Sequence, residues 1–444
     1  MKIVKLDTTT EKEFRAQLAK RSTTGYPEQE KAVAEILARV REEGDVALFD
    51  YAKLFDGVTL TADNISVTRA DIEKAYTLVD PALVETMKKS AENIRTFHEK
   101  QRRQSWIDTR ENGVMLGQRV TPMEIAGVYV PGGTAAYPSS VLMNVIPARV
   151  AGVKTVIMMT PAGEAKEGEK VPRVAGISAT TLVAADIAGV DTVFRAGGAQ
   201  AIAAMAYGTE SVPKTDKITG PGNIFVALAK KAVFGHVSID SIAGPSEVLI
   251  LADETADPAY VAADLLAQAE HDVLASAILI TTDEALAKKV SEKTEEFTEQ
   301  LERREIIRKS LDNCGMIFVA ENEAQMLDAA NRIASEHVEI LTADPYRTMY
   351  GLKHAGAIFL GPWSPEPLGD YFAGPNHILP TNGTARFFSP LNVDDFMKKT
   401  SLIAYSEEAL YDVNEDIIRF ADAEGLTAHA HAIAVRFQDT QRKA

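Results

Sequence analysis

The stretch EVLILADETADPAYVAADLLAQAEHDVLASAILIT (residues 247–281) contains a β-rich run, a helical segment and a second β-rich run. The runs 247–252 and 277–281 are short and almost entirely apolar, which is typical of buried parallel strands. Between them, Asp257 is a good helix N-cap and Pro258 suits the first helical position. This strand–helix–strand order predicts an α/β fold with a parallel sheet.

Two polar side chains stand at the end of this otherwise Ala- and Leu-rich helix. Gln268 and His271 are three residues apart, so they project from the same helical face. An amide oxygen and an imidazole nitrogen on one face can bind a metal ion at the edge of the sheet. Taken alone, however, such a pair is more often a solvated helix end.

Four further segments carry hydroxyl, carboxylate or imidazole groups in a similar setting. They are AGPSEVL (243–249) with Ser246, NRIASEHVEI (331–340) with Glu336 and His337, LGDYFAGPNHILPT (368–381) with Asp370 and His377, and EGLTAHAHA (424–432) with Glu424 and His429. In this order and spacing, the five motifs resemble those of the histidinol dehydrogenase family. The resemblance runs from VPGG (130–133) to AVRF (434–437).

This resemblance implies a zinc- and NAD-dependent enzyme of histidine biosynthesis that oxidises L-histidinol, through histidinal, to L-histidine. It also implies an intertwined homodimer. The zinc ligands that it implies are Gln268, His271, Asp370 and His429, and the cofactor contacts are Tyr129, Gln200 and Asn223. The implied substrate contacts are Ser246, Gln268, His271, His337, Asp370, His377, Glu424 and His429.

Each of the two oxidations needs a base that works near neutral pH. We expect His337 to take the hydroxyl proton in the first step and Glu336 to activate the water that adds to the aldehyde. The two residues are adjacent at a predicted helix-to-strand junction, where the chain changes direction. A surface position at the end of the helix is the alternative for this pair.

The proposed ligands have structural alternatives too. Asp370 can simply form a turn after Gly369, and His429 can face solvent on an amphipathic helix. His431 competes with His429 as the ligand, but it lies about 200° further round the helix. Zinc with one carboxylate remains a positive site, which can accept the neutral imidazole and amine nitrogens of histidinol.

Composition narrows the class of protein. The net charge is −16, from 47 Lys and Arg against 63 Asp and Glu, which disfavours a nucleic-acid partner. No run approaches the roughly 18 apolar residues of a membrane span, and the N-terminus lacks the apolar block of a signal peptide. The single cysteine, Cys314, opens an apolar run and is expected to be a buried structural residue. These features predict a soluble, cytoplasmic protein.

Two regions alternate between strand-like and helix-like runs, at 126–236 and 247–361. We expect two incomplete Rossmann-like domains, the second inserted in the first, because the helical residues 27–104 are expected to pack against the 247–361 region. The predicted domains are a metal- and substrate-binding domain (26–125 and 237–376) and an inserted nucleotide-binding domain (126–236), with helical arms at 1–25 and 377–444.

Three glycine turns follow predicted strands of the 126–236 region: VPGG (130–133), AGGAQ (196–200) and TGPGN (219–223). Turns at the carboxyl ends of parallel strands line one crevice, where glycine lets the backbone approach a nucleotide closely. Any one of them can be an ordinary tight turn. Three in successive units favour a nucleotide site.

Two other functions remain open at this point. One is a related dehydrogenase that acts on a different amino alcohol or a diol sulfonate, and the other is a zinc-stabilised binding protein without catalysis. Glu424, Ser246 and the Glu336–His337 pair favour histidinol as the substrate. The candidate bases and the glycine turns favour an enzyme over a binding protein.

Overall fold

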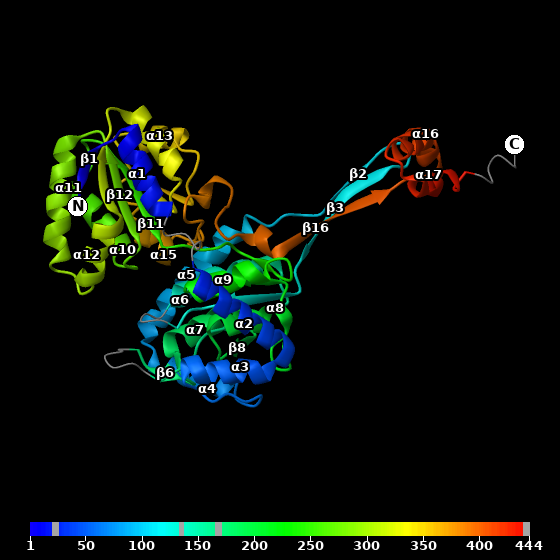
Figure 1. Cartoon of the computed structure of the whole chain (residues 1–444), viewed down its shortest axis with the longest axis horizontal. Helices are drawn as coiled ribbons and strands as arrows, with labels where there is room; N and C mark the ends of the chain where they lie inside the picture. The colour runs from blue at the N-terminus through cyan, green and yellow to red at the C-terminus, as the bar shows by residue number, and fades with distance from the viewer. Residues whose placement is uncertain (20–25, 133–136, 165–170, 438–444) are drawn as a thin grey trace. The chain divides into compact units, whose positions relative to one another are not determined.

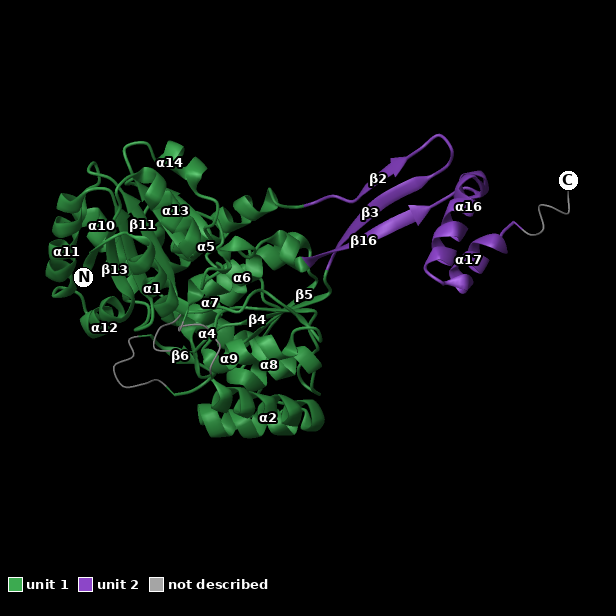
Figure 2. Ribbon diagram, turned by 45° about the horizontal axis from the view of Figure 1, so that its top comes forward, with its two compact units in different colours: residues 1–102, 123–396 green, residues 103–122, 397–444 purple. Residues whose placement is uncertain are grey.

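The computed structural model describes residues 1–19, 26–132, 137–164 and 171–437. The chain divides into two compact units (Figure 2). The first comprises Met1–Arg102 and Met123–Phe396, and the second comprises Arg103–Pro122 and Met397–Ala444. Among the helices of the described ranges, none is both long and apolar enough to cross a bilayer.

The first unit contains a six-stranded parallel sheet, which we call the catalytic sheet (Figure 1). In spatial order its strands are β1 (Ile3–Lys5), β13 (Gly315–Val319), β12 (Ser276–Thr281), β11 (Glu247–Ala252), β14 (His337–Leu341) and β15 (Ala357–Leu360). On one face the packed helices are α10 (Pro258–Ala269), α11 (Glu284–Thr298) and α12 (Arg304–Cys314). On the other they are α1 (Thr8–Ala19) and α13 (Glu323–Ile333).

The alternating direction of the β11 side chains explains why helices cover both faces of the catalytic sheet. Val248 and Ile250 pack against α10, whereas Leu249 and Leu251 pack in the core that includes α1 and α13. Successive strand residues point to opposite faces, so an uninterrupted apolar strand is buried on both sides. The predicted helix between β11 and β12 is confirmed: Asp257 accepts a hydrogen bond from the Ala259 N–H, and Pro258 begins the helix.

The N-terminal residues differ from the expected arm. β1 pairs in parallel with β13, with Ile3 opposite Ile317, so it forms the edge of the catalytic sheet. Phe14 of α1 is buried and lies edge-on to Phe318, with ring centroids 5.4 Å apart. A three-residue strand has too little sequence pattern to be recognised, because its stability comes from pairing with a distant strand.

The first unit also contains a five-stranded parallel sheet, which we call the nucleotide sheet. In spatial order its strands are β10 (Ser238–Ile239), β9 (Lys217–Thr219), β4 (Ile125–Tyr129), β5 (Thr155–Met159) and β8 (Thr192–Phe194). Its core includes residues of α2 (Pro27–Glu43), α3 (Asp45–Tyr51), α8 (Gly198–Tyr207) and α9 (Ile224–Val233). Packed together beside them are α4 (Arg69–Leu78), α5 (Pro81–Glu99), α6 (Pro138–Ala151) and α7 (Ala179–Ala188).

The helices of residues 27–99 therefore pack with the nucleotide sheet, and the expectation that they join the 247–361 region was wrong. Val33 and Leu37 of α2 share a core with Ile202 of α8. Amphipathic periodicity shows that a helix has a buried face but not which partner covers it. The nucleotide sheet still lies between two parts of the catalytic sheet in sequence, because β1 precedes it and β11 follows it.

The second unit is a three-stranded antiparallel sheet followed by two helices. The strands, in the order β16-β3-β2, are β16 (Met397–Ala404), β3 (Met115–Pro122) and β2 (Trp106–Thr109). The helices are α16 (Glu407–Ala423) and α17 (Thr427–Ala434). The segment 377–444 is thus not the purely helical arm that was expected, since residues up to 396 belong to the first unit and β16 pairs with β3.

Candidate active site

Several of the predicted site residues lie at the amino ends of the strands in the catalytic sheet. Counted from β11, this sheet has the strand order 3-2-1-4-5, with β1 added at one edge, so the order reverses between β11 and β14. Ser246 directly precedes β11 and Glu336 directly precedes β14. Open α/β sheets usually bind ligands at the carboxyl ends of their strands, so this site is at the opposite end.

Gln268 lies in the last turn of α10, and His271 follows the end of this helix. Gln268 is only 1% exposed, and neither its side-chain oxygen nor its nitrogen has a hydrogen-bond partner in the described part of the chain. Burying an amide without partners is costly, so such a group indicates a ligand. His271, by contrast, is exposed.

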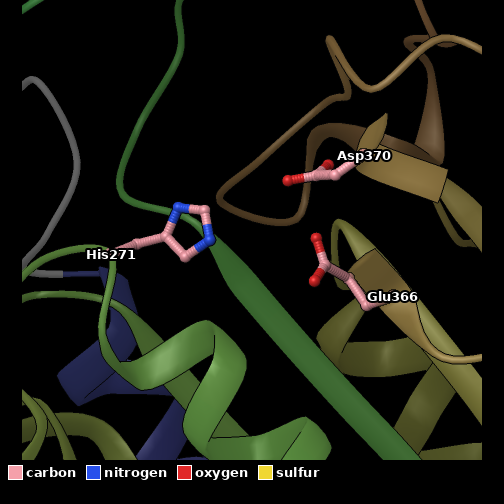
Figure 3. A group of neighbouring side chains, drawn as sticks. All are labelled: His271, Glu366 and Asp370. Carbon is pink, nitrogen blue, oxygen red and sulfur yellow. The ribbon is translucent and has the colours of Figure 1, made fainter. Parts of the chain in front are cut away.

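Asp370 lies on the short helix α15 (Glu366–Tyr371), which packs against α10. Its carboxylate converges with the carboxylate of Glu366 and the imidazole of His271. The ligand atoms of these three side chains lie within 4.8 Å of one another (Figure 3). An imidazole, two carboxylates and a nearby orphaned amide are a donor set that suits zinc. The predicted metal residues Gln268, His271 and Asp370 are therefore placed consistently with a cation site.

Glu366 was not among the predicted site residues. Its signal was the spacing in EPLGD (366–370), because residues four apart on a helix share one face. Asp370 was considered only as a ligand or as a turn residue after Gly369, and was not placed on a helix. Gly369 lets α15 approach β15 closely, since a Cβ atom at this position would lie 2.7 Å from Cε1 of Phe359.

The two carboxyl groups of α15 differ in their proton affinity. Burial, together with the neighbouring Asp370, raises the pKa of Glu366 to about 9. Burial also opposes ionisation of Asp370, but the hydrogen bond and charge of His377 outweigh it and lower the pKa of Asp370 to about 2. Nδ1 of His377 lies 3.4 Å from Oδ1 of Asp370 and 3.1 Å from the Asp370 carbonyl oxygen, so His377 contacts this site within its own chain.

The two candidate bases lie at the predicted helix-to-strand junction, between α13 and β14, and both are buried. The chain turns there through Ala334, which has a left-handed backbone with φ of 55°. Nδ1 of His337 lies 3.0 Å from the carbonyl oxygen of Glu247 and 3.7 Å from Oε2 of Glu336. A carbonyl oxygen only accepts, so Nδ1 carries the proton and Nε2 is left as the acceptor. Burial lowers the pKa of His337 to about 4, so the ring is neutral near pH 7.

Glu247 and Glu336 connect the starts of β11 and β14 through two hydrogen bonds. The Glu247 N–H donates to Oε2 of Glu336 at 2.8 Å, and the Glu336 N–H donates to Oε2 of Glu247 at 3.3 Å. Burial and the charge of Glu247 raise the pKa of Glu336 well above its usual value. Glu247 is a second site residue that the sequence analysis missed.

The face of α10 that carries Gln268 also carries Asp264, one turn earlier. Burial raises the pKa of Asp264, which lies close to Glu339 of β14. Oε1 of Glu339 in turn accepts the Glu366 N–H at 2.9 Å, which fixes the start of α15. His337 and Glu339 are two residues apart on one strand, so both face α10.

Glu424 and His429 belong to the second unit. Glu424 is the C-cap of α16, and His429 lies in α17, where His431 follows it. All three side chains are exposed. The structure thus brings together the predicted residues His271, Glu336, His337, Asp370 and His377. The two residues from the second unit remain predictions.

The three glycine turns lie at the carboxyl ends of the nucleotide sheet, except that Gly133 is outside the described residues. Tyr129 ends β4, is buried, and accepts the Gly198 N–H through its hydroxyl at 3.1 Å. Gln200 is buried in α8. Asn223 caps α9, since its side-chain oxygen accepts the N–H groups of Phe225 and Val226.

Two hydrogen bonds fix Gly220 in the turn after β9. The Gly220 N–H donates to Oδ2 of Asp240 at 2.8 Å, and the Gly220 carbonyl accepts from Nζ of Lys230 at 2.9 Å. Lys230 and Asp240 also form an ion pair, with both side chains 4% exposed. A Cβ atom at Gly220 would lie 2.0 Å from the carbonyl oxygen of Tyr129, so only glycine fits. This turn therefore lies directly against β4 at the point where the strand order reverses.

Comparisons with known proteins show the family of the chain. A family model described as histidinol dehydrogenase matches residues 19–437. Histidinol dehydrogenases from Halalkalibacterium halodurans and Geobacillus kaustophilus are 54% and 53% identical to the chain, covering 94% of it in each case and 96% and 95% of their own lengths. The crystal structure of a histidinol dehydrogenase from Elizabethkingia anophelis has a TM-score of 0.90 at 35% identity, and 99% of each chain is covered.

Proposed function

Because the chain belongs to the histidinol dehydrogenase family, we propose that it oxidises L-histidinol to L-histidine in two NAD-dependent steps, with histidinal kept in the site. The observation that carries the proposal is the convergence of His271, Glu366 and Asp370 beside the buried pair Glu336 and His337. A zinc ion held by Gln268, His271, Asp370 and His429 would fix the nitrogen atoms of the substrate, and NAD would accept the hydride in each step.

The side chains of the first unit supply the proton chemistry. The neutral Nε2 of His337 takes the hydroxyl proton of histidinol as the hydride leaves its carbon, which gives the aldehyde. Glu336 then takes a proton from the water that adds to the aldehyde, giving the hydrated form, from which the second hydride leaves. Glu247 holds both bases in place through its carbonyl oxygen, its N–H and its carboxylate.

The remaining site residues bind substrate and cofactor in this proposal. Ser246, His377 and Glu424 contact the polar groups of histidinol, whereas Tyr129, Gln200 and Asn223 line the NAD crevice. Glu424 and His429 come from the exposed helices of the second unit, which supports exchange of this unit between the subunits of a homodimer. The biosynthetic family and the single, buried cysteine support a reducing cytoplasm as the location.

The stoichiometry of NADH tests this function directly. We expect two NADH per histidinol consumed, loss of both after treatment with a chelator, and recovery when zinc is added. The measurement is absorbance of NADH against histidine produced, with an amino alcohol that lacks an imidazole as the control substrate. One NADH per substrate, with histidinal accumulating, would contradict the proposed four-electron reaction.

The variant Glu336→Gln separates the two steps. We expect oxidation of supplied histidinal to slow by about 10²-fold, because the water then has no base, while the alcohol step is affected much less. Gln retains the oxygen that accepts the Glu247 N–H, so the local fold is kept. The measurement is single-turnover NADH formation from each substrate, with the exposed Glu254→Gln as the control. Equal slowing of both steps would refute this division of roles.

A further inference from the structure

Glu366 is a buried carboxylate to which the proposed mechanism gives no role. It is 2% exposed, and its Oε1 has no hydrogen-bond partner among the described residues. Oε1 lies 3.7 Å from Nε2 of His337, which is longer than a hydrogen bond. A buried carboxyl oxygen without a partner is satisfied either by a proton on the carboxyl group or by a cation beside it.

The side chains around Glu366 indicate what satisfies this oxygen. Its carboxylate points toward that of Asp370 and toward His271, with all ligand atoms within 4.8 Å (Figure 3). Two carboxylates this close repel each other unless they share a proton or a cation lies between them. The orphaned amide of Gln268 lies on α10, the helix that ends just before His271 and packs against α15. Neutral and anionic donors thus surround one region.

We propose that Glu366 is a ligand of the catalytic metal, so that the first unit supplies four ligands, Gln268, His271, Glu366 and Asp370, without help from the second. This inference rests on the proposed function, in which the same ion binds the substrate. The remaining ligand, His429, and two nitrogens of histidinol would complete six positions with Gln268, His271 and Asp370. Glu366 is therefore a ligand of the substrate-free protein and leaves the ion when histidinol binds.

Zinc affinity of the full-length protein tests this inference without any assay of activity. Zinc is titrated against a chromophoric chelator, in the absence and presence of saturating L-histidinol, for the unchanged protein and for Glu366→Gln. We expect the substitution to weaken zinc binding by about 100-fold without substrate, at the upper limit of effects from outer-shell partners. With histidinol present, the two affinities should converge, which a merely structural role would not produce.

Two further measurements distinguish a ligand from a nearby charge. The matched control is Glu270→Gln, which removes a carboxylate beside His271 but outside the converging group. We expect it to change zinc affinity far less than Glu366→Gln does. In the cobalt-substituted, substrate-free protein, loss of a ligand should shift the visible absorption bands in Glu366→Gln only.

The outcomes separate this inference from the proposed function. If the unchanged protein binds no zinc, the proposed role of the metal fails. If it binds zinc and Glu366→Gln binds it equally well, or with unchanged cobalt bands, then Glu366 is not a ligand and only the inference is overturned. If Glu366→Gln does not fold, Glu366→Asp takes its place, because it keeps the charge but shortens the reach by one methylene.

Discussion

The rate of histidinol oxidation is expected to fall by about 10²- to 10⁴-fold when His337 is replaced by Asn, the range typical of losing a general base. Asn can still donate to the Glu247 carbonyl from its amide nitrogen, but it offers no basic nitrogen to the substrate. Because burial keeps the imidazole neutral near pH 7, this loss should appear at neutral pH without acidification. Single-turnover formation of NADH from histidinol measures it.

The exposed residue His236 provides the control, and His236→Asn is expected to leave the rate unchanged. Zinc content and the unfolding midpoint of His337→Asn should match those of the unchanged protein, since His337 is not among the proposed ligands. A rate loss of less than about tenfold in a folded, zinc-loaded variant would show that another group takes the hydroxyl proton.

Replacing Lys230 with Met is expected to lower the free energy of unfolding by about 3–5 kcal/mol. The substitution leaves the buried carboxylate of Asp240 without its cation and removes the hydrogen bond to the Gly220 carbonyl. The turn after β9 would then lose one of its two anchors, so NAD should also bind more weakly. Urea denaturation followed by circular dichroism gives the stability, and calorimetric titration gives the affinity for NAD.

The adjacent Lys231 is a matched control, because its ion pair is exposed to solvent. Its Nζ lies 3.8 Å from Oε1 of Glu30, and both side chains are exposed. Lys231→Met should change stability by no more than about 0.5 kcal/mol. Neutralising both members of the buried pair, with Lys230→Met and Asp240→Asn together, should restore part of the loss, since no unpaired charge remains. Equal stability of the two single lysine variants would refute the importance of the buried pair.

The local elements of the catalytic region could be predicted because their signals are contained in short segments. The apolar runs predicted β11 and β12, and the Asp257–Pro258 cap predicted the start of α10. The motif around Glu336 predicted the junction before β14. Cys314 is buried, as the apolar run after it predicted. Such features depend on neighbours in sequence, so they can be recognised without knowing which elements they pack against.

What the sequence did not reveal depends on contacts between distant segments. β1 is only three residues long and is stabilised by β13, more than 300 residues later. The pairing of β16 with β3 likewise joins residues 397–404 to 115–122. Glu366 and Glu247 gain their significance from side chains on other elements, namely Asp370 with His271, and Glu336. A single carboxylate in a sequence carries no sign of such a neighbour.

The end of each sheet at which a ligand binds has an electrostatic consequence. Helices in α/β folds run opposite to their strands, so the amino ends of the strands gather helix C-termini, which carry partial negative charge. α10 and α13 end beside the candidate metal site in this way. α8 and α9 instead begin at the carboxyl ends of the nucleotide sheet, where their N-termini carry partial positive charge. The backbone alone thus provides a field that favours a divalent cation at one site and the pyrophosphate of a dinucleotide at the other.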